Sequence, residues 1–321
     1  MKINERNIKL WSTLGSRATF GLTLFDLANK IENLVVLSCD VSTSAGLDRY
    51  RKAHKDKYIE IGISEQNLIG VAAGMASENF NVVTTTFAPF QTMRCCEQIK
   101  VNLGYMRQKV CMVGLASGLV LGNLGYTHCC IEDVAIMRSI PNLTVVTPAD
   151  CLETVKVVES SFDHKQSIYI RLTGASNNPI IYNEDYKFEI GKAVKIKSGT
   201  DISIIANGTM VYESLESAKF LDSQGISASV INMHTAKPID ESIILSEASK
   251  SKLIVTVEEH SVIGGLGSAV SEILSKIDYS PKQLFIGIPD TYSKGGEYSF
   301  LKKKFGLTND QISTKIINNY G

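Results

Sequence analysis

Short runs of apolar and β-branched residues alternate with longer segments of helical periodicity from one end of the chain to the other. This alternation is typical of βαβ units, in which helices connect parallel strands. The apolar runs are continuous, which indicates strands that are covered by helices on both faces. The sequence therefore predicts the α/β class, with first-half strands at residues 34–39, 81–86, 110–115, 143–147 and 168–172.

Two helices in the first half have clear signals. Residues 65–77 place their apolar side chains on one face at helical spacing. The segment from Thr147 to Asp150 predicts the start of a second helix. In this interpretation Thr147 is the N-cap, Pro148 is the first helical residue and Asp150 completes an acidic variant of the capping box.

A stretch rich in turn residues, GASNNPIIYNED at 174–185, separates the two halves and predicts a linker. We therefore expect one domain over residues 1–180 and a second over residues 181–321, each a doubly wound α/β unit. The second half has its own alternating series, with strands expected at 202–206, 229–232, 253–257 and 284–288 and helices near 211–222 and after Gly264-Gly265.

Composition and charge narrow the class of protein. The chain has 321 residues, 44% hydrophobic and 21% charged, as in an ordinary globular protein of about two domains. Its 33 basic and 33 acidic residues balance, so no net positive charge is available to bind nucleic acid. The sequence shows neither the apolar core of a signal peptide nor a membrane-spanning run, so we expect a cytoplasmic protein with reduced cysteines.

The segment IGISEQNLIGVAAG at 61–74 offers the first candidate chemistry. Its one carboxylate, Glu65, lies where a loop enters an apolar helix, and Phe87 and Phe90 follow the next strand. From the residues alone, a structural role is the more frequent explanation: Glu65 is favoured at a helix N-terminus, and the phenylalanines belong to the core.

A glycine-rich loop that ends in His128 follows the strand at 110–115, at the edge where open parallel sheets bind ligands. His128 is a candidate acid, base or hydrogen-bond donor, and a surface histidine on a flexible loop is an equally good interpretation. Cys129 and Cys130 are adjacent to it, but neighbouring side chains point apart, so no metal site is predicted. The glycines at 264–267 lack dinucleotide-binding spacing and indicate close packing instead.

Five segments carry a family resemblance: GISEQNLIGVAAGMA, TTFAPFQTMRCCEQIK, THCCIEDVAIMRSIPNLTVVTPAD, ISIIANGTMVYESLESAKFL and VTVEEHSVIGGLGSAVSEIL. In this order they resemble the C-terminal half of transketolase, and most closely the separate C-terminal subunit of split, two-chain transketolases. The resemblance implies that the first domain, of the thiamin diphosphate-binding fold, binds the aminopyrimidine of thiamine diphosphate. The second would be a transketolase C-terminal domain that supports assembly.

The resemblance also implies roles for single residues. Glu65 would hydrogen-bond to pyrimidine N1′ and so promote loss of the proton from thiazolium C2, which calls for a carboxyl in a water-poor pocket. Phe87 and Phe90 would pack on the pyrimidine ring, with Met93 in the family's third aromatic position. Two further matches to the split-subunit pattern, Arg94 and Gln98, are expected to face a partner chain.

The GDG…N motif that holds the diphosphate and Mg²⁺ in this family is absent from the sequence. The resemblance therefore implies a partner, the N-terminal transketolase subunit that carries this motif and the Mg²⁺ ligands. Self-association through the present chain would complete an α₂β₂ heterotetramer with active sites between chains. No metal ligand is assigned to the present chain.

Substrate residues match the family only in part. Arg17 and Ser44 match positions that contact a sugar phosphate, and His128 matches the substrate-facing histidine. Three polar family positions are occupied here by Ala116, Leu124 and Gly174. Loss of these charge-assisted hydrogen bonds, about 1.5–3 kcal/mol each, predicts a substrate other than the usual sugar phosphates.

These observations predict a transferase subunit that moves a two-carbon ketol unit from a ketose to an aldehyde and needs its partner for activity. Two alternatives remain open. The first is an enzyme that uses keto acids, such as a 2-oxo acid dehydrogenase β subunit or a deoxyxylulose-phosphate-synthase-like protein. The second is a non-catalytic scaffold subunit.

Overall fold

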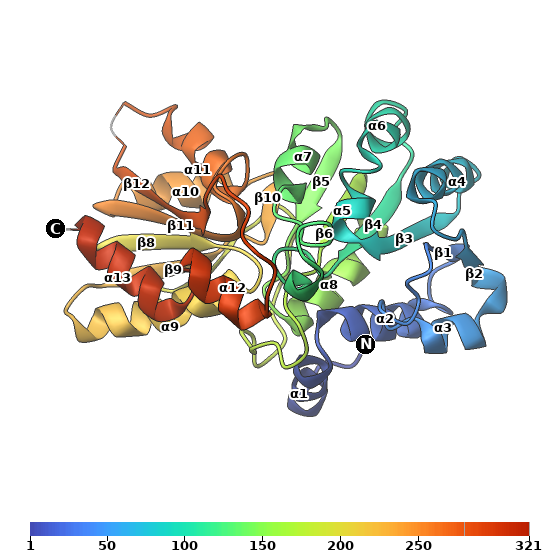
Figure 1. The fold of residues 1–321 in the computed structure, drawn as a ribbon, viewed down its shortest axis with the longest axis horizontal. Coiled ribbons are helices and arrows are strands. Elements are labelled where there is room, and N and C mark those ends of the chain that lie inside the picture. The colour runs from blue at the N-terminus through green and yellow to red at the C-terminus, as the bar shows by residue number, and fades with distance from the viewer. Residues whose placement is uncertain (279, 321) are drawn as a thin grey trace.

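The computed structural model describes residues 1–278 and 280–320, which form two parallel-sheet units side by side. The N-terminal unit, blue to green in Figure 1, lies beside the C-terminal unit, yellow to red, and each sheet is covered by helices on both faces. This arrangement confirms the α/β class and the two doubly wound units. None of the helices in the described residues is long and apolar enough to cross a membrane.

The first sheet has seven strands, all parallel except one edge strand. Its order is β10 (Thr235–Lys237), β5 (Leu143–Val146), β6 (Ser167–Arg171), β4 (Val110–Leu115), β3 (Asn81–Phe87), β1 (Leu34–Ser38) and β2 (Tyr58–Glu60).

Every residue of β1, β4, β5 and β6 is buried, which explains the continuous apolar runs in the sequence. One face packs against α2 and α8 and the other against α4, η2 and α7. The helices of this half are α1 (Glu5–Leu14), α2 (Ser16–Leu27), α3 (Asp48–Ala53), α4 (Glu65–Ser77), α5 (Ala88–Gln91), α6 (Cys96–Gln98), α7 (Asp133–Ser139) and α8 (Cys151–Asp163), with the short helical turns η1 (Lys55–Lys57), η2 (Ile99–Tyr105) and η3 (Gly122–Leu124).

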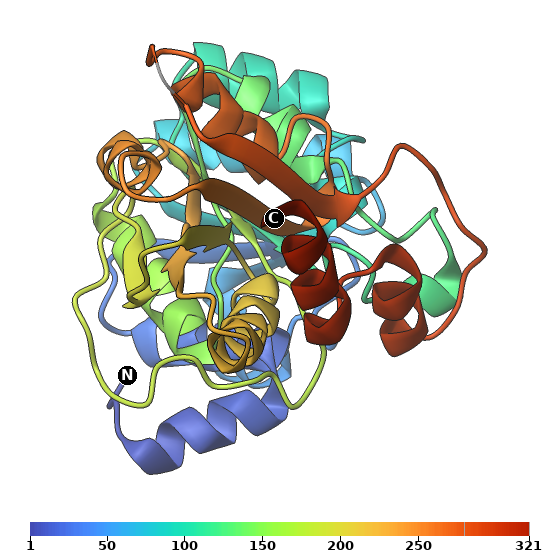
Figure 2. The ribbon, with the colours of Figure 1, turned by 90° about the vertical axis from the view of Figure 1, so that its left-hand side faces the viewer.

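The second sheet has five strands, in the order β12 (Lys282–Ile288), β11 (Leu253–Ser261), β8 (Ile202–Ala206), β9 (Ala228–Asn232) and β7 (Val194–Lys197). Its helices are α9 (Met210–Ser223), α10 (Glu241–Ala248), α11 (Leu266–Leu274), α12 (Tyr298–Phe305) and α13 (Asn309–Tyr320). Figure 2 shows α9 and α13 on one side of this sheet, and α10 and α11 pack together on the other.

The predicted N-cap of the helix after β5 is wrong by three residues. Thr147 does not start the helix, because its carbonyl, which an N-cap uses to accept the first helical hydrogen bond, accepts from the N–H of Gly208 at 3.3 Å. Its own N–H donates to the carbonyl of His234 at 2.7 Å. Asp150 is the N-cap: its Oδ1 accepts from the N–H of Glu153 at 2.8 Å, and the Glu153 carboxylate accepts from the N–H of Ala149 at 2.6 Å. The capping box therefore exists, but it is formed by Asp150 and Glu153.

The expected linker at 174–185 contains neither helix nor strand. The chain then enters the second unit at β7 but returns once to the first, since β10 pairs antiparallel with β5. The division at residue 180 stays a prediction, and β10 lies in the sheet of the other unit.

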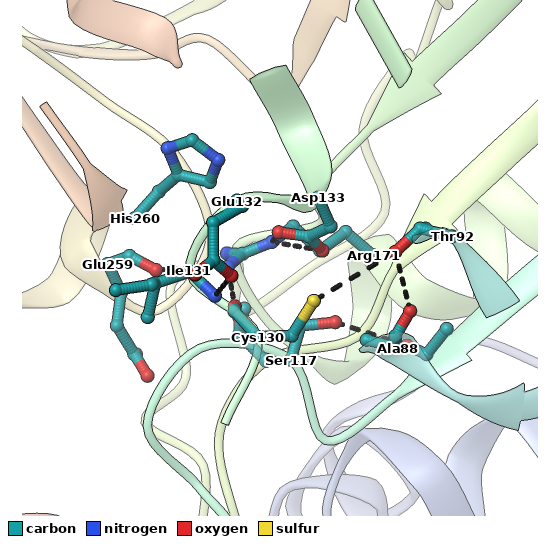
Figure 3. A network of polar contacts seen from close by, with 12 residues as sticks. Ala88, Thr92, Ser117, Cys130, Ile131, Glu132, Asp133, Arg171, Glu259 and His260 are labelled. Atoms are coloured by element: carbon teal, nitrogen blue, oxygen red, sulfur yellow. Dashed lines mark hydrogen bonds and ion pairs between the residues drawn. The ribbon is translucent and has the colours of Figure 1, made fainter. Parts of the chain in front are cut away.

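One buried ion pair lies where the two units meet (Figure 3). Arg171, at the end of β6 and 1% exposed, donates from Nε to both carboxylate oxygens of Asp133 at 2.9 and 2.8 Å. Its Nη2 donates to the carbonyl of Cys130 at 3.1 Å and to that of Glu259, on β11, at 3.0 Å. Burial alone lowers the pKa of Arg171, but the Asp133 carboxylate outweighs it, so the pKa is raised and the guanidinium stays charged.

Arg171→Met removes the guanidinium and leaves the Asp133 carboxylate buried without its cation. We expect the free energy of unfolding to fall by about 3–5 kcal/mol, the usual cost of removing one partner of a buried pair. Chemical denaturation followed by circular dichroism measures the loss. The control is Arg51→Ala, which breaks an exposed pair with Asp48 and is expected to cost less than about 1 kcal/mol. If Arg171→Met lost no more stability than Arg51→Ala, the prediction that the fold depends on the buried pair would be wrong.

Candidate functional site

The predicted site residues gather at one edge of the first sheet. Strands β1, β3, β4 and β6 are parallel, so their carboxyl ends meet at the edge where open α/β sheets bind ligands. Ser44 follows β1, Phe87 ends β3 and Phe90 lies just beyond it, and His128 follows β4. Glu65 comes after the neighbouring strand β2.

Glu65 is the first residue of α4. This helix buries Leu68, Ile69 and Ala72 in the core beside the sheet, which fixes the position of its first turn. The Glu65 side chain is only 3% exposed, at a helix end that favours negative charge. Its Oε2 accepts a hydrogen bond from Nη1 of Arg94 at 2.7 Å, whereas its Oε1 accepts none from residues 1–278 and 280–320.

Three rings and the guanidinium of Arg94 form a continuous set of contacts that ends at this carboxylate. The His128 ring lies edge-on to Phe90, with ring centroids 5.3 Å apart, and 6.2 Å from the centroid of Phe87. The guanidinium of Arg94 lies over the face of Phe90, 4.0 Å from its centroid, while it binds Glu65. We call Glu65, Phe87, Phe90, Arg94 and His128 the edge cluster. Met93, also predicted here, is 40% exposed.

The loop that carries His128 is fastened at both ends. Gly118 and Cys130 exchange two backbone hydrogen bonds of 2.8 and 2.9 Å. From the second unit, Oε1 of Glu259 accepts from the N–H of Leu119 at 2.7 Å. Gly118 has φ of +73° and a Cβ there would lie 2.3 Å from Oε1 of Glu259, so this approach requires glycine. Within the loop, Nδ1 of His128 lies 2.9 Å from Oγ1 of Thr127.

Arg17 and Ser44 belong to two segments whose backbones pack against each other. Arg17 is near the start of α2, and burial lowers the pKa of its guanidinium. The turn that carries Ser44 packs closely on this helix, since a Cβ on Gly46 would lie 3.1 Å from the carbonyl oxygen of Arg17. Arg17 also shares a small hollow with Gly174.

The three positions that depart from the family pattern differ in their surroundings. Ala116 is completely buried, so it does not line an open surface of this chain, whereas Leu124 is 57% exposed. Gly174 has φ of +78°, and a Cβ there would lie 2.4 Å from Oδ1 of Asn178. The backbone at Gly174 therefore disfavours any side chain, an arginine included.

Three cysteines near the edge cluster are not activated as nucleophiles. Burial raises the pKa of Cys39 to about 11 and that of Cys95 to about 12, and the charge of Glu65 adds to both shifts. Burial likewise raises the pKa of Cys129 to about 11. These thiols stay protonated near neutral pH. The described residues contain no group of three or more His, Cys, Asp or Glu side chains that could hold a metal ion.

Two contributors were missed at the sequence level. Arg94 was expected, with Gln98, to face a partner chain, which stays a prediction; its guanidinium also lies on Glu65 and Phe90, a contact that was not anticipated. The four-residue spacing from Phe90 to Arg94 could have indicated this contact, because a helical turn brings such side chains together. Glu259 had no such signal, since it reaches the His128 loop from a strand about 140 residues away. Gln98 is half-buried on α6 and donates to Glu97.

Comparisons with known proteins agree with this architecture. Residues 12–177 match the family described as transketolase, pyrimidine binding domain, and residues 191–312 match the family described as transketolase, C-terminal domain.

Individual relatives cover almost the whole chain. A putative transketolase C-terminal section from Methanocaldococcus jannaschii is 39% identical over 94% of this chain and 95% of that protein. A 6-deoxy-6-sulfo-D-fructose transketolase subunit from a Clostridium species is 37% identical over 92% of this chain and 91% of that protein. Among solved structures, a split-gene transketolase described as an inactive β4 tetramer is 34% identical with a TM-score of 0.85, covering 95% of this chain and 97% of that one. The chain thus belongs to the transketolase family, as a counterpart of the C-terminal subunit of split transketolases.

Proposed function

We propose that this chain is the pyrimidine-binding subunit of a two-chain, thiamine-diphosphate-dependent transketolase that transfers a two-carbon ketol unit from a ketose to an aldehyde. The observation that carries the proposal is the buried carboxylate of Glu65, which Arg94 links to the face of a phenylalanine at the edge of a parallel sheet. The relatives named above are transketolase subunits, which favours a ketose donor over a keto acid.

The edge cluster fits the aminopyrimidine of thiamine diphosphate. Oε1 of Glu65 is available for a ring nitrogen, and the face of Phe90 that carries the Arg94 guanidinium is a flat apolar surface on which a planar ring could stack in its place. When bound, the cofactor supplies the thiazolium carbon that carries the two-carbon unit. Glu65 would then share a proton with N1′. Because its side chain is buried, water would have little access to this proton.

His128 is the proposed proton donor and acceptor toward the substrate. Its Nδ1 is engaged by Thr127, and Phe90 holds the ring edge-on, so Nε2 is the nitrogen left for a substrate oxygen. An imidazole in this position can pass a proton to or from that oxygen.

The diphosphate and Mg²⁺ are assigned to a partner chain. The sequence has no GDG…N motif, and the described residues form no metal-ligand cluster. The partner would be an N-terminal transketolase subunit, and two copies of each chain would form the heterotetramer. The similar split-gene transketolase, described as an inactive β4 tetramer, supports both self-association and the need for a second subunit.

The isolated chain is expected to fold and to show no transketolase activity, because it lacks ligands for the diphosphate and its metal. Adding the purified partner chain with thiamine diphosphate and Mg²⁺ should create activity, which a coupled assay of aldehyde release from the ketose measures. Mg²⁺-dependent turnover by this chain alone would contradict the two-chain assembly.

Glu65→Gln should leave the complex assembled but lower kcat by about 10²–10⁴-fold, the range for a positioned proton transfer. An amide can still hydrogen-bond to N1′ but cannot exchange a proton with it. Hydrogen–deuterium exchange at C2 of the bound cofactor, followed by NMR, measures the step directly. The matched control is Glu97→Gln, an exposed carboxylate on α6 that pairs with Gln98. Unchanged exchange in Glu65→Gln would remove Glu65 from the mechanism.

The substrate is proposed to end in something other than the usual terminal phosphate, such as an unphosphorylated, sulfonated or nucleotide-linked chain. Arg17 is the one cation in the hollow beside Gly174, where the family has an additional arginine. A second hollow of about 290 Å³ adjoins Gly174 between the two units, and its one cation, Lys302, pairs with Glu213 at 2.8 Å. The Clostridium relative is named for a sulfonated ketose, which supports an altered end group.

Ser176→Arg tests this proposal without forcing a side chain onto the left-handed backbone of Gly174. Ser176 is exposed and borders both hollows, so an arginine can supply the missing guanidinium. We expect kcat/KM for xylulose 5-phosphate with ribose 5-phosphate to rise by about 10–100-fold, the worth of one charge-assisted hydrogen bond.

Ser176→Gln is the control for side-chain bulk and should change kcat/KM for the phosphorylated pair very little. Unphosphorylated, sulfonated and nucleotide-linked sugars are compared in the same assay. Wild-type protein that already uses the phosphorylated pair best, with no effect of the arginine, would contradict the proposal.

A further inference from the structure

The guanidinium of Arg94 meets both features of the edge cluster that the proposed function assigns to a cofactor ring. It donates to Oε2 of Glu65 at 2.7 Å and lies 4.0 Å above the centroid of Phe90. A guanidinium is planar, delocalised and a donor of hydrogen bonds, and it stacks readily on aromatic faces. Arg94 therefore engages one oxygen of the carboxylate and the aromatic face at the same time.

An aminopyrimidine in this site needs the same two contacts. It is also a flat ring that stacks on a phenyl face, and when protonated at N1′ it donates a hydrogen bond to a carboxylate. Two planar groups cannot lie on the same face of Phe90 within reach of the same buried carboxylate. Loading of the ring therefore requires the guanidinium to leave.

We propose that Arg94 is a placeholder, which occupies the pyrimidine position in the unloaded chain and swings out when the cofactor binds. The inference rests on the proposed function, because it takes the edge cluster to be the pyrimidine site. Arg94 would then act as a positioning residue that governs cofactor loading.

The burial of the two partners shows which of them can move. The side chain of Arg94 is 44% exposed, so it can rotate into solvent without opening the core, whereas Glu65 is 3% exposed and fixed by α4. The backbone of Arg94 is held in place, since its carbonyl accepts from Nε2 of Gln66 at 3.2 Å. The expected change is confined to one side chain.

The placeholder also explains how a carboxylate can stay buried before loading. An ionised carboxyl group removed from water is costly unless a cation or hydrogen bond compensates it. Within residues 1–278 and 280–320 Arg94 is the one side chain that makes an ion pair with Glu65. This arrangement weakens cofactor binding. The apparent affinity for the ring equals the intrinsic affinity multiplied by the fraction of sites in which Arg94 has already left.

Thiamine diphosphate affinity of the complex with the partner chain, in Mg²⁺ and by isothermal titration calorimetry, tests the inference. Arg94→Ala should lower Kd by about tenfold if roughly one site in ten is open in the wild type. Arg94→Lys keeps the charge without the planar group, so its Kd should lie between those of the wild type and Arg94→Ala. The control, Arg51→Ala, removes an exposed arginine that pairs with Asp48 outside the edge cluster and should leave Kd unchanged.

A second titration uses the isolated chain and the fragment 4-amino-2-methylpyrimidine, followed by NMR. Arg94→Ala should bind the fragment several-fold more tightly than wild type. In a Glu65→Gln background the same substitution should bring a smaller gain in affinity, because the neutral amide holds the Arg94 guanidinium less tightly than the carboxylate does. Arg94→Gln, which keeps a hydrogen-bonding side chain, replaces Arg94→Ala if thermal melting shows that the alanine variant is unfolded.

The outcomes separate the two proposals. Wild-type complex that binds thiamine diphosphate, with equal or weaker binding by Arg94→Ala, overturns the placeholder and leaves the proposed function standing. Absence of cofactor and fragment binding in wild type and Arg94→Ala alike overturns the proposed function, and the placeholder with it.

Discussion

The buried guanidinium of Arg171 is the contact on which the rest of the arrangement depends. It joins strand β6 to two other segments that are distant in sequence. One is the segment 130–133, through the carbonyl of Cys130 and the carboxylate of Asp133, and the other is β11 of the second sheet, through the carbonyl of Glu259. Because a guanidinium offers several donors in one rigid plane, these parts are held in a fixed relation. The side chain of Glu259 then extends the connection to Leu119, at the other end of the His128 loop from Cys130. The second unit thereby shapes the edge of the first at which the site lies.

Much of the fold follows from local patterns. Strands such as β4 and β8 are buried on both faces, so their continuous apolar runs could be recognised without tertiary information. The N-cap of α8 was misplaced because the carbonyl of Thr147 pairs with the N–H of Gly208, about 60 residues away, and no local rule contains that contact. β10 has only three residues and joins the sheet of the other unit, which again is a long-range event.

The site shows the same division between local and long-range information. Glu65, Phe87, Phe90 and His128 could be singled out because family motifs mark them, and the structure brings these four together. The contact of Arg94 with Glu65 joins two segments about 30 residues apart and depends on how α4 packs beside α6 and the turn that precedes it. Gly174 had been noted for the missing arginine, and only its backbone angle shows that the position resists a side chain.

The return of the chain through β10 has a practical meaning for attempts to divide the protein. A fragment that ended at residue 180 would lose β10 and leave β5 as an uncovered edge, with the backbone N–H and C=O groups of a wholly buried strand exposed to other chains. Such edges are templates for intermolecular pairing and aggregation. The pyrimidine-binding unit is therefore not self-sufficient, and insertions between the two units are better tolerated at the exposed tip of the connecting segment than a cut through it.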